Sequence, residues 1–120
     1  MQNNQLKQLI DTSSRIILKV GSSLLINENN NDINYHWLKN FSKEIQSLTD
    51  KKKQIMIVSS GSVALGRKQL NLVKNLSLDE KQAAAAVGQI HLSHAWKEVL
   101  KSFNLESAQI LLAPDDTETR

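Results

Sequence analysis

Three short runs of mainly branched apolar residues stand out along the chain. They cover Arg15–Val20, Ile55–Val58 and Ala108–Leu112, and a glycine or a proline follows each of them closely. Continuous apolar runs of this length, rather than alternating ones, are typical of strands buried on both faces of a parallel sheet. The pattern therefore predicts three such strands, the last of which ends before Pro114.

Two stretches of helical period lie between these runs. The first begins after Asn34, a favoured capping residue, and places five apolar residues on one stripe: Trp37, Leu38, Phe41, Ile45 and Leu48. The second is predicted to run from Ser77 to about Phe103, because Ser77 and Glu80 have the spacing of a capping box. Its Ala83–Gly88 segment is rich in small residues, so we expect close packing against another helix or backbone there.

The order strand, helix, strand predicts an α/β fold. A crossover helix joins two parallel strands, and such a connection is nearly always right-handed. Residues 1–14 are interpreted as a polar leader with one helical turn around Leu6, Leu9 and Ile10. Residues 27–34 are nearly all Asn, Asp and Glu, which indicates a solvent-exposed loop.

Lys19 and Gly21 form the first candidate site. Lys19 is the one charge near the end of a buried strand, and Gly21 and Ser22 follow it. A glycine turn lets the backbone approach an oxyanion, and a nearby ammonium neutralises its charge, so the arrangement is typical of phosphate binding. A lysine that extends from a strand end beside an ordinary turn explains the same residues equally well.

A second glycine turn lies at the same predicted edge of the sheet. The second strand runs into Ser59, Ser60, Gly61 and Ser62, after which a short helix is expected to begin. Parallel strands end at one edge, and in open α/β sheets this edge is where ligands bind. Two serine–glycine turns at one edge therefore indicate a ligand site.

His91 and His94 lie three residues apart on the second helix. This spacing is compatible with metal ligation, but no third ligand accompanies them, and histidines on the helix surface are the preferred interpretation. No metal ligand is predicted among the side chains.

Composition excludes several classes of protein. The net charge is only +3 and aromatic residues make up 4%, which disfavours nucleic acid as the main partner. The absence of cysteine excludes disulfides and thiolate metal sites. No apolar run has the length of a membrane span, and the N-terminus lacks the apolar core of a signal peptide. These observations favour a soluble cytoplasmic protein.

Three segments carry a resemblance to a known family. They are Ile17–Leu25 (ILKVGSSLL), Val58–Arg67 (VSSGSVALGR) and Lys81–Gln89 (KQAAAAVGQ). In this order they resemble the glutamate 5-kinases (gamma-glutamyl kinases) of the amino acid kinase family, and the match continues through Asp116 to Arg120. The third segment is the most specific to these kinases. Ser62 and Val63 replace a commoner alanine and isoleucine, at positions with no expected chemical role.

The resemblance implies a fold and a domain boundary. It implies an open, mainly parallel sheet with helices on both faces, the αβα sandwich of the amino acid kinases. Residues 15–120 would form the N-terminal portion of such a domain. The nucleotide-binding half, with a substrate-side aspartate and asparagine, would lie beyond this portion, so the 120 residues alone are expected to be inactive. A complete protein is expected to form a homo-oligomer.

The resemblance also implies a reaction: transfer of the ATP γ-phosphoryl group to the side-chain carboxylate of L-glutamate, which gives L-glutamyl 5-phosphate for proline biosynthesis. Lys19 would be the catalytic electrostatic group, and Gly21 and Ser22 would bind the ATP phosphates beside it. Ser60 and Gly61 would bind glutamate. Mg²⁺ would accompany ATP and be held mostly by phosphates and water.

Other functions remain open from the sequence. Kinases that act on aspartate, acetylglutamate or a nucleoside monophosphate would share Lys19 and Gly21, although the Lys81–Gln89 segment argues against them. A non-catalytic glutamate-binding module and a kinase fused to a reductase are further alternatives.

Overall fold

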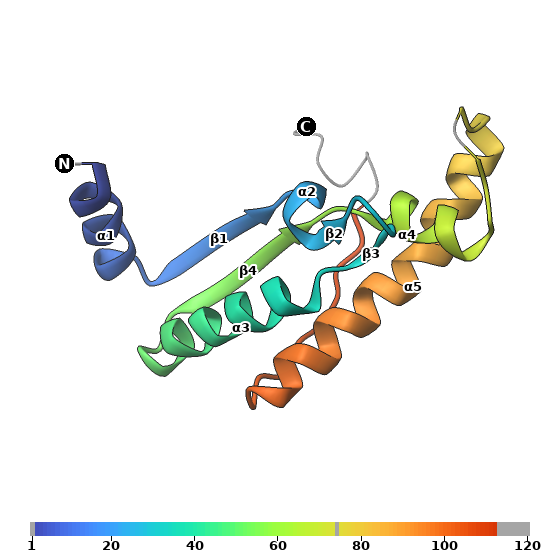
Figure 1. Ribbon diagram of the computed structural model, residues 1–120. Coiled ribbons are helices and arrows are strands. Elements are labelled where there is room, and N and C mark those ends of the chain that lie inside the picture. Colours follow the sequence, from blue (N-terminus) through green and yellow to red (C-terminus); the bar gives the residue numbers. More distant parts are fainter. Residues whose placement is uncertain (1, 74, 113–120) are drawn as a thin grey trace, which may run out of the picture.

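The computed structural model describes residues 2–73 and 75–112 of the 120-residue chain. Figure 1 shows a short sheet with two long helices beside it and a small hairpin near one end. In chain order the elements are α1 (Gln2–Thr12), β1 (Arg15–Val20), α2 (Ser22–Leu25), β2 (Ile26–Asn27), β3 (Asp32–Ile33), α3 (Tyr35–Asp50), β4 (Gln54–Ser59), α4 (Ser62–Gln69) and α5 (Leu78–Ser102).

β1 and β4 form the main sheet. They pair in parallel, in a register that runs from Arg15 opposite Gln54 to Val20 opposite Ser59. The helix α3 connects them, so the predicted α/β order and the parallel pairing of the first two strands are confirmed.

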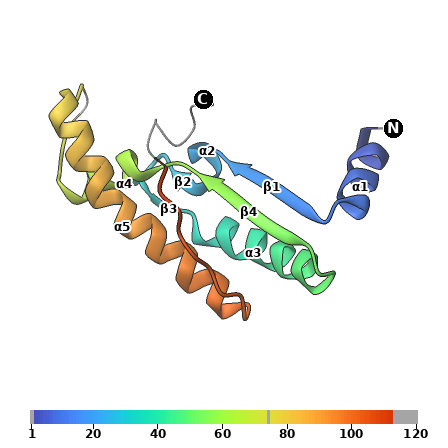
Figure 2. The same cartoon turned by 180° about the vertical axis from the view of Figure 1, so that it is seen from behind.

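Only one face of this sheet is covered within the described residues. Both views place α3 and α5 on the same side of β1 and β4 (Figures 1 and 2). On the other face Ile17, Met56 and Val58 are 69%, 52% and 48% exposed. The prediction that both strands are buried on two faces is therefore wrong for this part of the chain, because no described helix packs on the second face. The covered face carries the residues that pack on the core: Leu18, Val20, Ile55 and Ile57.

Both long helices begin where their capping residues predict. The side chain of Asn34 accepts a hydrogen bond from the backbone N–H of Trp37 at the start of α3. At the start of α5, Ser77 and Glu80 form a complete capping box. Because each cap satisfies backbone donors that the first turn leaves free, short polar segments fix these helix starts.

An aromatic cluster joins the helices to the sheet. Trp37 stacks on Phe41 with ring centroids 4.8 Å apart, and Phe41 meets the edge of Trp96 at 5.8 Å. The indole Nε1 of Trp96 donates to Ser59 Oγ over 3.1 Å. The core thus extends from α3 through α5 to the last residue of β4, which stands at the edge where the site was predicted.

The third predicted strand does not form in the described residues. Residues 108–112 are irregular, and Ile110, Leu111 and Leu112 are each about 70% exposed. Figure 2 shows this segment, in red, running back from the end of α5 towards the carboxyl edge of the sheet. A strand requires ladder hydrogen bonds to a neighbour, and this segment makes none with the other residues that the structure describes. Pro114 and the motif residues from Asp115 to Arg120 lie outside the described residues.

Two polar segments contain more structure than expected. The leader forms an eleven-residue helix, α1, which has no buried residue. The Asn-rich loop contains the antiparallel pair β2 and β3, and Asn31 in its turn has φ of 51°. Asn adopts this left-handed conformation more readily than most residues, which explains why an Asn-rich sequence supports the turn. No helix in the described ranges is long and apolar enough to cross a membrane.

Candidate functional site

The two strands of the main sheet end side by side at one edge, as predicted. Val20 lies opposite Ser59, and each strand then enters a helix through a glycine. Gly21 precedes α2, a short helix that the sequence did not predict, and Gly61 precedes α4.

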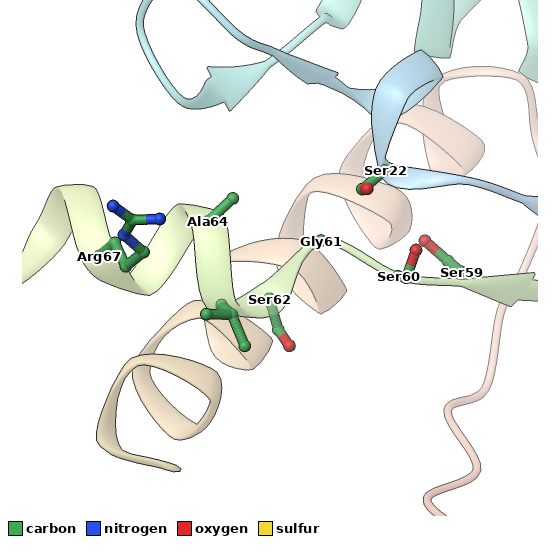
Figure 3. Close-up of a pocket in the computed structure, with 8 residues that line it drawn as sticks. Ser22, Ser59, Ser60, Gly61, Ser62, Ala64 and Arg67 are labelled. Atoms are coloured by element: carbon green, nitrogen blue, oxygen red, sulfur yellow. The ribbon is translucent and has the colours of Figure 1, made fainter. Parts of the chain in front are cut away.

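A hollow of about 520 Å³ opens at this edge (Figure 3). Its lining is mostly small and polar: Ser22, Ser59, Ser60, Gly61, Ser62, Val63, Ala64 and Arg67. The hollow therefore brings together three of the five residues proposed from the sequence, namely Ser22, Ser60 and Gly61.

The backbone conformation at position 61 requires a glycine. Its φ is +122°, a region that other L-residues rarely adopt, and an added Cβ would lie 2.9 Å from Ile26 Cγ1. The turn thus lets β4 pass directly beneath the hairpin and enter α4. Gly21 differs, because its φ is −72° and the nearest atom to an added Cβ is Ser23 Oγ at 3.9 Å. Gly21 leaves open space next to the backbone.

Lys19 is not part of the hollow's lining. It lies opposite Val58 and is exposed on the uncovered face of the sheet, two residues before Gly21. Within the described residues no carboxylate forms an ion pair with its ammonium. The structure therefore places Lys19 and Gly21 at the carboxyl end of β1, directly before Ser22 of the hollow's lining, with open space next to the Gly21 backbone.

Close helix packing holds α4 in place. An added Cβ on Gly66 would lie 1.7 Å from the carbonyl oxygen of Ala84, and one on Gly88 would lie 1.7 Å from that of Ser62. Both distances are far shorter than any real contact, so the two backbones touch only because these positions lack a side chain. The close packing predicted for the Ala83–Gly88 segment is confirmed, and it fixes the residues that line the hollow.

Arg67 is a site residue that the sequence analysis missed. It is the last residue of the Val58–Arg67 segment, where the sequence analysis gave it no role, yet its side chain lines the hollow. Its Nε is buried and has no hydrogen-bond partner among the described residues. Helical spacing is the signal that reveals it, because Ala64 and Arg67 are three residues apart and share one face of α4.

Asp32 connects the β2–β3 hairpin to the helices α4 and α5. Its carboxylate accepts a hydrogen bond from Lys68 Nζ at 2.9 Å and lies 3.5 Å from His91 Nε2. The hydrogen bond from Lys68 is the main cause that lowers the pKa of Asp32. His91 thus faces a carboxylate while His94 is exposed, and the two do not share a partner within the described residues.

The lowered pKa of Asp32 predicts a loss of stability in acid. The ionised group contributes stability that is present above its unfolded pKa and is lost as the pH falls through the lower folded pKa. We expect Asp32→Asn to reduce the free energy of unfolding at pH 7 by up to about 1 kcal/mol, since all three partners are partly exposed. Urea unfolding should show this difference fading as the pH falls below about 4, the unfolded pKa of an aspartate. Glu106→Gln, which changes an exposed carboxylate outside the described ion pairs, serves as control; a constant Asp32→Asn effect across this range would contradict the prediction.

Comparison with known proteins gives consistent matches. A profile of the amino acid kinase family matches residues 14–120. The chain is 44% identical over 108 residues to a glutamate 5-kinase of Paramagnetospirillum magneticum, which covers 90% of this chain and 29% of the relative. It is 48% identical over 107 residues to one of Rhodopseudomonas palustris strain BisB5, with 88% and 28% covered. A glutamate 5-kinase of a Ruegeria species is 39% identical over 112 residues, with 92% and 30% covered. The chain thus spans less than a third of the length of these curated relatives.

Proposed function

The chain belongs to the amino acid kinase family, and we propose that the complete protein transfers the γ-phosphoryl group of ATP to the side-chain carboxylate of L-glutamate. The product is L-glutamyl 5-phosphate, in the first step of proline biosynthesis. The observation that carries this proposal is the meeting of Ser22, Ser60 and Gly61 around one hollow at the carboxyl edge of the sheet. The similarity to several glutamate 5-kinases, at 39–48% identity, supports this choice of acceptor.

The chemistry requires alignment and charge neutralisation rather than a general base. A carboxylate is already a nucleophile, so the protein has to bring it in line with the γ-phosphorus and compensate the charge on the phosphoryl oxygens. Lys19 supplies a positive charge at the end of β1, where no described carboxylate neutralises it. Its role is therefore electrostatic stabilisation of the transferring group.

Ser60 and Gly61 suit the binding of the acceptor. Gly61 is the N-cap of α4 and provides no side-chain hydrogen bond to the first turn. Free backbone N–H groups at a helix start, together with the Ser60 hydroxyl, form a favourable setting for a carboxylate.

The residues at the end of β1 fit the phosphates of ATP. An added Cβ at Gly21 would meet nothing closer than 3.9 Å, so phosphate oxygens have room to reach the backbone N–H groups of Gly21 and Ser22. ATP supplies the transferred phosphoryl group. Mg²⁺ would accompany ATP, held mostly by the phosphates and water, as this ion usually keeps several waters and binds substrate phosphates. As expected from the sequence, we propose a cytoplasmic homo-oligomer.

The decisive experiment compares acceptors. With ATP and Mg²⁺, the complete protein should phosphorylate L-glutamate with a rate about 100-fold higher than L-aspartate, because the aspartate carboxylate falls roughly one methylene short of the γ-phosphorus. Hydroxylamine trapping of the acyl phosphate measures both rates. N-acetylglutamate and uridine monophosphate serve as acceptors for the alternative kinase functions. Equal rates with glutamate and aspartate, or faster reaction with another acceptor, would argue against the proposal.

A further inference from the structure

Arg67 brings a positive charge to the hollow. Among the described residues that line the hollow it is the only charged one, and the rest are serines, glycine, alanine and valine. No described carboxylate forms an ion pair with it, and its buried Nε has no hydrogen-bond partner in the described part of the chain. A guanidinium remains ionised at physiological pH, and a buried donor without a partner is unfavourable. The hollow thus contains a cation whose buried Nε has no hydrogen-bond acceptor among the described residues, which is a setting for an anion.

The position of Arg67 indicates which anion it binds. Figure 3 shows Ser22, Ser59 and Ser60 near the strand ends, with Gly61 next, and Arg67 further along α4. The reacting carboxylate and the phosphates belong at the strand ends, where Gly21 and Lys19 lie. A group bound by Arg67 therefore lies at the opposite end of the acceptor.

We infer that Arg67 binds the α-carboxylate of the acceptor amino acid, an inference that rests on the proposed function. The planar guanidinium matches a carboxylate with two parallel N–H···O bonds. Arg67 then selects acceptors that carry a second carboxylate, while Ser60 and Gly61 bind the carboxylate that reacts. A nucleotide phosphate is a weaker match, because Arg67 stands on α4 rather than on the β1 side of the hollow.

The test is Arg67→Met in the complete protein. Loss of a hydrogen-bonded charge at the non-reacting end should raise the KM for L-glutamate about 10- to 100-fold. We expect kcat to change by less than about threefold, since the interaction is equal in the ground and transition states. The KM for ATP should stay constant. Arg67→Lys should recover part of the glutamate affinity.

Lys68→Met is the matched control. It removes the same charge from the next residue of α4, whose ammonium binds Asp32 and does not line the hollow. Its KM for glutamate should equal that of the unmodified protein.

A second measurement needs no variant. 4-Aminobutanoate keeps the reacting carboxylate and lacks the α-carboxylate, so the unmodified protein should use it at least about 100-fold less efficiently than glutamate, as expected when a buried polar group is left unpaired. Arg67→Met should narrow this ratio to about tenfold or less.

The outcomes separate this inference from the proposed function. An unchanged glutamate KM in a folded Arg67→Met protein, a raised ATP KM in its place, or efficient use of 4-aminobutanoate by the unmodified protein would overturn the role of Arg67 alone. Failure of the unmodified protein to phosphorylate glutamate would reject the proposed function, and the inference with it.

Discussion

Replacing Lys19 with Met is expected to lower turnover by about 10²–10³-fold, the usual cost of removing one preorganised electrostatic contact to a transition state. Methionine keeps the apolar stem and removes the charge. Lys19 stands beside the hollow rather than in its lining, so the KM for L-glutamate should change much less than turnover. Steady-state kinetics of the complete protein, with kcat and KM determined separately, measures both.

Arg15→Met provides the control for this result. Arg15 lies on the same uncovered face of β1, at the other end of the strand, where its Nε donates to Gln54 Oε1 over 2.8 Å. The change removes a charge from the same surface at a distance from the site, and turnover should stay near normal. If Lys19 only extends into solvent from the strand, Lys19→Met would match this control. A folded Lys19→Met protein with normal turnover would therefore remove Lys19 from the mechanism.

Local chemistry made much of the fold predictable. Asn34 and Ser77 act within a single turn, so their capping roles follow from a few neighbouring residues, and both helices begin where predicted. The parallel pairing of β1 and β4 follows from the length of the segment that connects them. The site edge was predictable for the same reason, since parallel strands end together.

Features that depend on distant partners were not predictable in the same way. The apolar runs of β1 and β4 fit burial on both faces, but Ile17 and Met56 are exposed because no described element packs over them. Residues 108–112 have strand-like composition and lack ladder partners. Arg67 was missed because its significance lies in the hollow that forms where the turn after β1 meets the turn and helix after β4. The sequence places Arg67 on one face of α4 with Ala64 but does not show that this face borders a hollow.

For Gly88→Ala, the packing of α4 on α5 and helix propensity alone predict opposite changes in the free energy of unfolding. In a helix interior, Gly→Ala normally stabilises by roughly 1 kcal/mol. At Gly88 the added Cβ would lie 1.7 Å from the carbonyl oxygen of Ser62, which is backbone and has no rotamer to change. The helices must separate, so we expect Gly88→Ala to lower the free energy of unfolding by about 3 kcal/mol, the upper part of the usual overpacking range.

Ala86→Gly measures how much the low helix propensity of glycine alone costs in the same helix. Ala86 is exposed on α5, two residues before Gly88, so this change should cost only about 1 kcal/mol. Urea unfolding followed by circular dichroism compares the three proteins. Because Ser62 lines the hollow, the displacement of α4 in Gly88→Ala should also weaken glutamate binding, whereas Ala86→Gly should not. Stabilisation by Gly88→Ala would show that the two backbones do not touch as the structure has them. It would also contradict the view that α5 positions Ser62 and the start of α4.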